Sequence, residues 1–253
     1  ANFGMRLTWI LGRAVSLLED KRALAALVTW PKFSLTSFLM VSRLARQGIA
    51  PRTVIDAGAN VGQFAVAAAK LWPAVTVHSF EPNPASVARL RQNVSRLRSV
   101  AVYPVAVGDA RGHVEFHVNS FSHSSSALRL TAAHRAVFPD AREQDSVNVE
   151  VVRLDDALAD VELTPPVVLK LDVEGYEAKA IAGARRLLPR VSYVVVETCF
   201  EPLHEGQPTF GEIVALLNAE GFCFARPVDH LMNPRDGKIV MMDALFVRPA
   251  HGN

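Results

Sequence analysis

Short apolar, strand-like segments alternate with helical segments along most of this chain, and this alternation limits the folds open to it. The clearest strand-like runs are residues 53–58, 75–82, 167–175, 193–198 and 241–249. Apolar strands that alternate with helices predict a mostly parallel sheet covered by helices on both faces. In such α/β folds, ligands bind at the carboxyl ends of the strands, near the point where the strand order reverses.

The segments between these strands carry the three- and four-residue apolar spacings of helices. We expect helices over residues 64–72, 84–97 and 210–220, and a further helix that ends near residue 188. Residues 99–109 and 113–118 are β-rich, whereas the polar, Ser-rich residues 119–147 give no clear assignment.

Residues 1–50 differ from the rest of the chain. They have helical apolar spacings broken at Trp30-Pro31, and they hold seven Lys or Arg against Glu19 and Asp20, a net charge of 7 − 2 = +5. Residues 51–253 therefore carry 2 − 5 = −3. We expect a helical N-terminal extension over residues 1–50 and one main domain over residues 51–253. The extension can cap the active site, contact a second copy in a homo-oligomer, or rest on an anionic membrane surface.

Composition excludes several classes of protein. The overall charge of +2 and the acidic main domain argue against a nucleic-acid-binding protein. Two cysteines are too few for a disulfide scaffold or a cysteine-based zinc site, and they suit a reducing compartment. No apolar run approaches the ~20 residues of a membrane helix, and no secretory signal is evident. We expect a cytoplasmic protein that is soluble or associates with membranes through residues 1–50.

Acidic residues recur where the predicted strands end. They are Asp56, Glu81, Asp109, Asp172 and Glu197. A single acid at such a position is ordinary, because Asp caps helices and begins turns. Five acids at corresponding positions indicate a shared ligand site at the carboxyl edge of the sheet.

The turn in residues 54–64, VIDAGANVGQF, discriminates between two ligands. A dinucleotide-binding turn needs a glycine where this chain has Asn60, and Asp56 would repel a phosphate. An acid there suits the ammonium and sulfonium groups of S-adenosylmethionine. The alternative is that Gly58 and Gly62 only allow tight strand-to-helix packing. Glu81, 25 residues after Asp56, is placed to accept the ribose hydroxyls of either cofactor.

The segment AVGD, residues 106–109, follows the third predicted strand. Val107 can lie against an adenine ring and Asp109 near its amino group, or the segment can be a simple Gly-Asp turn.

Several motifs in this order resemble the FkbM family of S-adenosylmethionine-dependent methyltransferases. They are DAGANVGQF (56–64), FEPNP (80–84), RLRQN ending at Asn93, AVGD (106–109), the serine run 124–126, VVRLDD (151–156), LKLDVEGYE (169–177) and VVVE (194–197). The resemblance covers roughly residues 53–222. It implies a Rossmann-like class I methyltransferase fold, with a seven-stranded, mostly parallel sheet whose last strand is antiparallel. It also implies a hydroxyl oxygen of a sugar or another natural-product or glycolipid acceptor as the methylated atom.

The glycine turn and these motifs together give the expected cofactor-binding residues. These are Asp56, Gly58, Asn60, Gly62, Phe64, Glu81, Pro82, Asn83, Val107, Asp109 and Asp172.

Methyl transfer to a hydroxyl also needs a group that manages the acceptor's proton. Lys170, Asp172 and Glu174 alternate along a strand and should share one side of it. Asp172 can act as general base or metal ligand, Glu174 can orient the acceptor, and Lys170 can pair with an acid and lower its pKa. The alternative is a structural Lys–Asp pair. His204, in a loop, is a second candidate base or a solvated side chain.

The acceptor is expected to contact the serine run and nearby acids. The substrate-binding candidates are Ser124, Ser125, Ser126, Glu174, Glu197 and His204. Some sugar O-methyltransferases of this fold hold magnesium between acids that correspond to Asp172 and Glu197, and two carboxylates suit such a hard cation without establishing it.

The sequence therefore predicts an S-adenosylmethionine-dependent O-methyltransferase that acts on a sugar hydroxyl of a glycolipid or natural-product glycoside. The alternatives are a methyltransferase with a non-sugar acceptor, and a non-catalytic binding module that keeps the fold. A dehydrogenase is disfavoured by Asn60, and a nucleic-acid methyltransferase by the lack of an N-P-P-[YF] motif.

Overall fold

The computed structural model describes residues 21–119, 125–138, 143–233 and 236–249. Seven strands form the main sheet: β1 (Thr53–Ala57), β2 (Thr76–Phe80), β3 (Val100–Tyr103), β7 (Val167–Leu171), β8 (Tyr193–Cys199), β9 (Cys223–Met232) and β10 (Ile239–Val247). Their order is β3-β2-β1-β7-β8-β10-β9. β10 is antiparallel to both of its neighbours, whereas β3, β2, β1, β7 and β8 pair in parallel. The predicted seven-stranded, mostly parallel sheet with an antiparallel last strand is confirmed.

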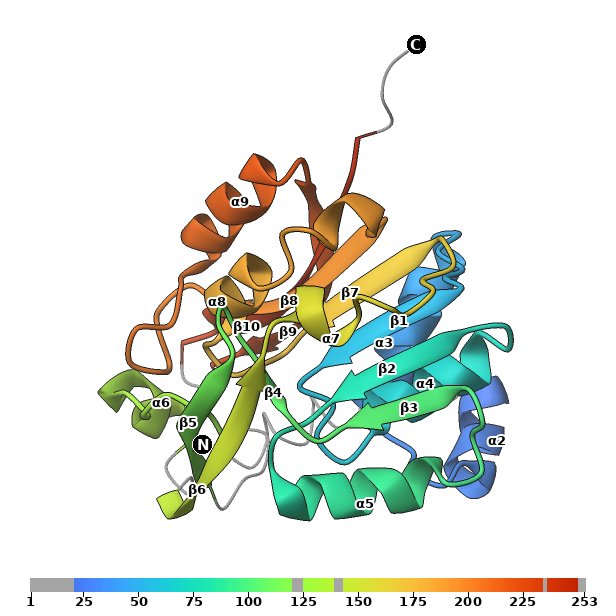
Figure 1. The fold of residues 1–253 in the computed structure, drawn as a ribbon, viewed down its shortest axis with the longest axis horizontal. Coiled ribbons are helices and arrows are strands. Elements are labelled where there is room, and N and C mark those ends of the chain that lie inside the picture. Colours follow the sequence, from blue (N-terminus) through green and yellow to red (C-terminus); the bar gives the residue numbers. More distant parts are fainter. Residues whose placement is uncertain (1–20, 120–124, 139–142, 234–235, 250–253) are drawn as a thin grey trace.

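Helices cover both faces of this sheet (Figure 1). One face packs against α7 (Leu154–Ala157), α8 (Glu177–Ala182) and α9 (Phe210–Ala219). The other packs against α3 (Leu35–Arg46), α4 (Gln63–Leu71) and α5 (Pro84–Val94).

The strand alternation decides which side chains reach each face. In β1, Val54 joins the core beneath α3 and α4, whereas Ile55 joins the opposite core. Asp56 therefore points toward the α3–α4 face. The same alternation in β7 puts Lys170 on that face, directly beside Asp56 in the strand register. Two charged residues thus lie side by side in an otherwise apolar layer.

A second, three-stranded sheet was not predicted. It has the order β4-β6-β5, formed by β4 (Ala106–Val107), β5 (Gly112–Asn119) and β6 (Glu143–Val152). The single β-rich segment expected over residues 99–109 is therefore wrong: it divides into β3 in the main sheet and β4 in the second sheet. The unassigned region 119–147 contains α6 (Ala132–Val137) and the beginning of β6.

The C-terminal half differs from expectation in two places. The helix expected to end near residue 188 is shorter, because α8 ends at Ala182 and a 3-10 turn, η2 (Leu188–Arg190), follows. β9 was missed, because its exposed, charged sequence with a central Pro227 has no apolar alternation. Such a sequence is tolerated because β9 lies at the edge of the sheet.

The described part of the N-terminal extension consists of α2 (Lys21–Thr29) and α3. The two helices are separated near Trp30-Pro31, as the sequence predicts, and Ser34 caps α3 by accepting a hydrogen bond from the backbone of Ser37. α3 packs into the core of the main domain through Met40, Val41 and Leu44.

α2 exposes Leu24, Leu27 and Val28 to solvent. Residues 1–20 lie outside the described residues, so contact of residues 1–50 with a membrane or with a second copy stays a prediction. Sedimentation with anionic vesicles tests the first and light scattering tests the second. Among the helices that the structure describes, none combines the length and apolarity required to cross a membrane.

Candidate active site

The turn after β1 brings the backbone close to the loop after β7. Gly58 has a φ of +83°, and a Cβ placed on it would lie 1.7 Å from the backbone oxygen of Asp172. Gly62 has a φ of +89°, and a Cβ there would lie 2.6 Å from a methyl group of Leu90. Packing against the backbone therefore requires glycine at position 58, and the left-handed φ favours it at both positions. Asn60 also lies in the left-handed region, with a φ of +46°.

Glu81 joins this turn to the segment after β2. Its Oε2 accepts a hydrogen bond of 2.8 Å from the backbone N–H of Asn60, and its Oε1 accepts one of 2.9 Å from the N–H of Asn83. Burial raises the pKa of Glu81 to about 7, although the two backbone donors act to lower it. Each oxygen keeps a second lone pair, so the carboxylate can still accept two hydroxyl groups.

A first cavity, of about 620 Å³ including its opening to solvent, lies beside Glu81. Its wall combines an apolar slot with a few acids. The lining residues are Gly58, Asn60, Phe80, Glu81, Pro82, Val105, Ala106, Val107, Phe116, Ser125, Ala127, Asp172, Val173, Glu174 and Tyr176. A narrow apolar slot with a carboxylate at its edge suits a planar base joined to a diol-bearing sugar.

Six of the residues predicted to bind the cofactor line this cavity: Gly58, Asn60, Glu81, Pro82, Val107 and Asp172. The other five do not: Asp56, Gly62, Phe64, Asn83 and Asp109. Asn83 instead caps α5, accepting a hydrogen bond of 3.0 Å from Ala85. The strand-end position expected for Asp109 is wrong, because the third strand of the main sheet ends at Tyr103. Asp109 follows β4 in the second sheet and is exposed.

Asp56 was expected to face the cofactor's positive charge, and the structure places it elsewhere. Its side chain is fully buried, and its Oδ1 lies 3.4 Å from Nζ of Lys170. Burial raises the pKa of Asp56, an effect that Lys170 opposes. Lys170 also donates a 2.9 Å hydrogen bond to Oδ2 of Asp172 and lies 5.3 Å from the ring centre of Phe64. Lys170 thus pairs with an acid, as the sequence predicts, and it does so with both Asp56 and Asp172. Asp56 stabilises the charge of Lys170 from within the core.

A left-handed backbone conformation in the loop after β7 positions Glu174, and strand alternation does not predict it. β7 ends at Leu171, and Glu174 has a φ of +52°, in the left-handed region. Ser126 Oγ donates a 2.6 Å hydrogen bond to the carbonyl oxygen of Glu174. Oε1 of the buried Glu177 accepts hydrogen bonds from the N–H groups of Val173 and Gly175. These contacts fix the loop on both sides of Glu174.

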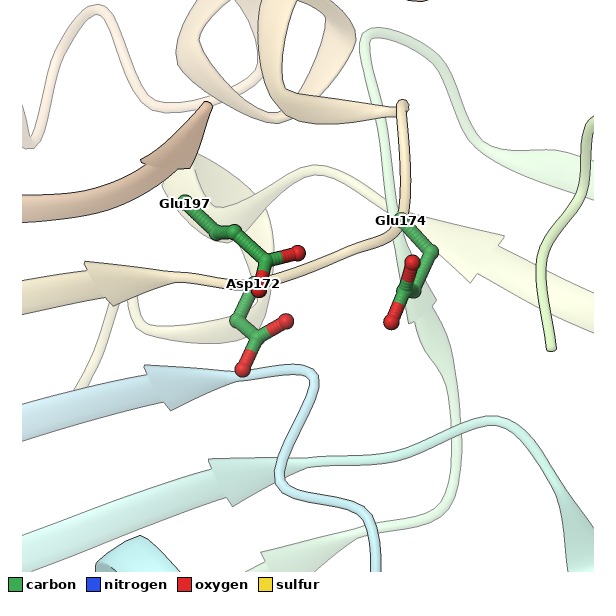
Figure 2. Close-up of side chains that lie close together, drawn as sticks. All are labelled: Asp172, Glu174 and Glu197. Carbon is green, nitrogen blue, oxygen red and sulfur yellow. The ribbon is translucent and has the colours of Figure 1, made fainter. Parts of the chain in front are cut away.

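Three carboxyl groups converge at this point, as Figure 2 shows. Oxygen atoms of Asp172, Glu174 and Glu197 all lie within 4.8 Å of one another. Burial is the main cause that raises the pKa values of Glu174 and Glu197 well above the usual range, and the charge of Asp172 adds to it. Such a group of oxygens can share a proton, bind hydroxyl groups, or hold a hard cation.

A second and larger cavity, of about 1340 Å³ including open space, lies on the α3–α4 side of the sheet. It shares four lining residues with the first cavity: Gly58, Asn60, Asp172 and Glu174. The remaining wall comes from α3, α4, α6, β7, β8, β9, β10 and adjoining loops, with Glu197 and Lys170 among its residues. The two cavities therefore meet at the loop that carries Asp172 and Glu174.

The other predicted acceptor residues fall into different environments. His204 is buried, and its Nε2 lies 3.9 Å from Oε2 of Glu174, so the expectation of a solvated side chain is wrong. Ser125 lines the first cavity, and its Oγ accepts a hydrogen bond from Asn119. Ser126 uses its hydroxyl on backbone groups. Ser124 lies outside the described residues.

Sequence reasoning missed several residues of the site. The apolar slot of the first cavity uses Phe80, Phe116 and Tyr176, and the second cavity uses His134 and Asp243. Glu177 belongs to the motif LKLDVEGYE, but the sequence does not show that its carboxylate accepts hydrogen bonds from the loop after β7. Asp243 is the one charged residue in the apolar strand β10. This pattern was a sequence signal that its side chain faces a cavity.

Comparison with known proteins gives consistent matches. The sequence profile described as "Methyltransferase FkbM domain" matches residues 56–224. The 2-O-methyltransferase NoeI of Sinorhizobium fredii is 27% identical over 212 residues, which cover 81% of this chain and 86% of that protein. The 31-O-demethyl-FK506 methyltransferase FkbM of Streptomyces tacrolimicus is 33% identical over 202 residues, which cover 70% and 75%.

Two further matches are more distant. The hexuronic acid methyltransferase AglP of Haloferax volcanii is 26% identical over 144 residues, which cover 56% of this chain and 54% of that protein. A crystal structure of a candidate sarcosine dimethylglycine methyltransferase from Galdieria sulphuraria superposes with a TM-score of 0.50 at 9% identity, covering 84% of this chain and 85% of that one. At that identity the superposition supports the fold alone.

Proposed function

Because this chain belongs to the FkbM family of methyltransferases, we propose that it is an S-adenosylmethionine-dependent O-methyltransferase whose acceptor is a sugar hydroxyl. The observation that carries the proposal is the meeting of two cavities at Asp172 and Glu174. One cavity has the shape and polarity for an adenosine, and the other can hold the acceptor. Carboxylates stand at the junction, where a hydroxyl proton must be removed.

The residues of the first cavity fit S-adenosylmethionine. Phe80, Val107 and Phe116 offer apolar contact to the adenine, and Glu81 offers two acceptor oxygens to the ribose diol. When bound, this cofactor supplies an electrophilic methyl group on a positively charged sulfur. Acids at the junction would favour that charge.

The chain's own residues then have to orient the acceptor and accept its proton. A sugar hydroxyl is a poor acid, so a general base at hydrogen-bonding distance is required. Asp172 is about one-third exposed, lines both cavities and is held at 2.9 Å by Lys170. We assign it the role of base, with Glu174 and Glu197 orienting the acceptor hydroxyl.

Magnesium is a second way to acidify the hydroxyl. Asp172, Glu174 and Glu197 would hold it, since their oxygen atoms lie within 4.8 Å of one another and oxygen ligands suit this ion. Bound there, the ion would lower the pKa of a coordinated hydroxyl. Comparing the enzyme after chelation with EDTA, and again after Mg²⁺ is restored, tests this role.

The relatives support oxygen as the acceptor atom. One is named a 2-O-methyltransferase, a second acts on 31-O-demethyl-FK506, and a third is named a hexuronic acid methyltransferase. Their names do not transfer an individual acceptor to this chain, but they favour an oxygen on a sugar or on another ring-bearing natural product.

The test is transfer of a labelled methyl group from S-adenosylmethionine to a panel of methyl pyranosides that includes fucosides and rhamnosides. We expect a product methylated on oxygen with at least one glycoside, and none when the protein is omitted. Transfer to non-sugar alcohols or amines run beside this panel, without transfer to any glycoside, would show that the acceptor class is wrong. Cofactor binding without transfer to any acceptor would favour a non-catalytic binding module.

A further inference from the structure

We propose that the acceptor cavity selects a neutral or amino-substituted pyranoside and excludes acidic sugars, and that Asp243 is a main determinant of this choice. The proposal rests on the proposed function, because it names the acceptor class of that same site. The origin, charge and polarity of the second cavity's wall support this selection.

Much of that wall comes from outside the span that matches the family. The family profile covers residues 56–224. The beginning of α3 contributes Ser34, Thr36 and Ser37, whereas β9 and β10 contribute residues that include Leu231 and Asp243. Arg43 of α3 joins these two segments, because it donates hydrogen bonds of 2.7 Å to the Val228 carbonyl oxygen and 3.1 Å to Oδ1 of Asp229. The segments on both sides of the matched span therefore form one surface toward the acceptor.

The charge on this wall is strongly unbalanced. Four acids line the cavity, Asp172, Glu174, Glu197 and Asp243, and among the described lining residues Lys170 is the one Lys or Arg. With Glu174 and Glu197 protonated, the formal sum is 1 − 2 = −1, and with all four acids ionised around a divalent cation it is 1 − 4 + 2 = −1. An acceptor carboxylate or phosphate would face a negative wall in either case. Like charges placed together at a binding site oppose the wrong ligand.

Of the four acids on this wall, Asp243 is the one that has no part in the proposed methyl transfer. It lies directly opposite Glu197 in the β8–β10 register and opposite Asp229 in the β9–β10 register. The neighbouring Met242 and Ala244 pack into the α8–α9 core, so strand alternation turns Asp243 toward the acceptor side. A carboxylate at this position can accept a hydrogen bond from a hydroxyl or ammonium group of an acceptor, whereas a carboxylate on the acceptor offers no donor.

The remaining wall suits a pyranoside ring. Hydroxyl groups at the start of α3 can donate to and accept from ring hydroxyls, and Met40, Leu231 and Met241 offer apolar contact to the C–H faces of a sugar. Apolar side chains set among polar ones suit a ring that has both C–H faces and hydroxyl groups.

The experiment compares sugars that share a ring and differ in charge. Labelled methyl transfer is measured with the methyl glycosides of glucose, glucosamine and glucuronate, and of galactose, galactosamine and galacturonate, at equal concentrations. We expect kcat/KM for the best neutral or amino member to exceed that of its uronate by about tenfold or more, as like-charge contact implies.

The variant Asp243→Asn removes the charge while keeping the size of the side chain. We expect it to raise KM for the preferred glycoside, to leave kcat within about threefold, and to reduce discrimination against the uronate by about tenfold. Asp236→Asn, the same change on the same hairpin and outside the cavity, should alter neither quantity, since the Asp236 side chain is partly exposed and contacts Lys238 at 3.7 Å.

Each other outcome counts against the proposal. A uronate methylated as well as its neutral partner would overturn the charge selection, and unchanged discrimination in Asp243→Asn would remove Asp243 as its determinant. If the protein binds S-adenosylhomocysteine but methylates no member of the panel, the cavity does not take a single pyranosyl ring, while the cofactor assignment survives. If S-adenosylhomocysteine does not bind, the proposed function itself fails.

Discussion

Replacing Asp172 by Asn is expected to lower kcat for methyl transfer by about 10²–10⁴-fold, the usual contribution of a general base. Asp172 stands where the two cavities meet, and its carboxylate is oriented by Lys170 at 2.9 Å. Asn keeps the size of the side chain but cannot accept a proton, and Lys170 keeps Asp56 as an ionic partner. Initial rates with the glycoside that is methylated fastest provide the measurement.

The matched control for this prediction is Asp109→Asn. The sequence associates Asp109 with the cofactor, whereas in the structure it is exposed and lines neither cavity. Its kcat and KM should equal those of the wild type. If Asp172→Asn kept most of the wild-type kcat, or if Asp109→Asn lost as much, the assignment of the base would be wrong.

Replacing Lys170 by Met is expected to lower the free energy of unfolding by about 3–5 kcal/mol at pH 7, the cost of removing one partner from a buried ion pair. Asp56 would then remain fully buried without the charge that lies 3.4 Å away in the wild type. Urea unfolding measures the effect. Lys179→Met, at an exposed lysine that contacts the Tyr176 hydroxyl, should change stability by less than about 0.5 kcal/mol.

A second variant separates this charge effect from a general packing defect. Asp56→Asn combined with Lys170→Met removes both charges, so the double variant should regain much of the stability lost in the single variant. A double variant less stable than Lys170→Met would contradict the ion-pair explanation.

The pH dependence of Lys170→Met follows from the same pair. Burial raises the pKa of Asp56 above 3.8 and Lys170 opposes that rise, so removing the lysine raises the pKa further. The folded variant then holds a proton that the unfolded chain releases at a lower pH. Its stability should therefore fall as the pH rises through the interval between the two pKa values, and the deficit relative to wild type should be smaller in acid. A deficit that does not change with pH would rule out this protonation.

The sequence predicts those parts of the fold that depend on local pattern. Strand and helix periodicity place β1, β2, β7, β8 and β10 to within a few residues, because the first four are buried parallel strands with largely apolar sequences and the antiparallel β10 is largely apolar as well. β9 has no such run, since most of its side chains are exposed at the sheet edge. β4 was not predicted as a separate strand, because two residues are too few to show a period. β6 alternates, but it pairs in a small sheet separate from the main one, and that second sheet was not predicted.

The sequence predicts a site residue when that residue lies in a motif at a strand end. It does not predict a site residue whose neighbours are set by the register between strands. Glu81, Asp172 and Glu174 fall where strand ends predict a ligand edge. Asp56 looks equivalent in sequence, yet its register partner across the sheet is Lys170, and that pairing keeps it in the core. Asp243 lies 46 residues beyond Glu197 and becomes its neighbour only because β10 inserts antiparallel beside β8. Such long-range pairings have no local sequence signal.

The central claim is that the cavity beside Glu81 binds S-adenosylmethionine, and calorimetric titration with S-adenosylhomocysteine tests it most directly. We predict saturable binding with one site per chain in the wild type and in the control Glu150→Ala, whose partly exposed side chain lies 3.7 Å from Arg111. Glu81→Ala should bind at least about tenfold more weakly, because the ribose acceptors and the bonds to Asn60 and Asn83 are lost. Unchanged affinity in folded Glu81→Ala would contradict the assigned cavity. An absence of binding to folded wild-type protein would contradict the assigned cofactor.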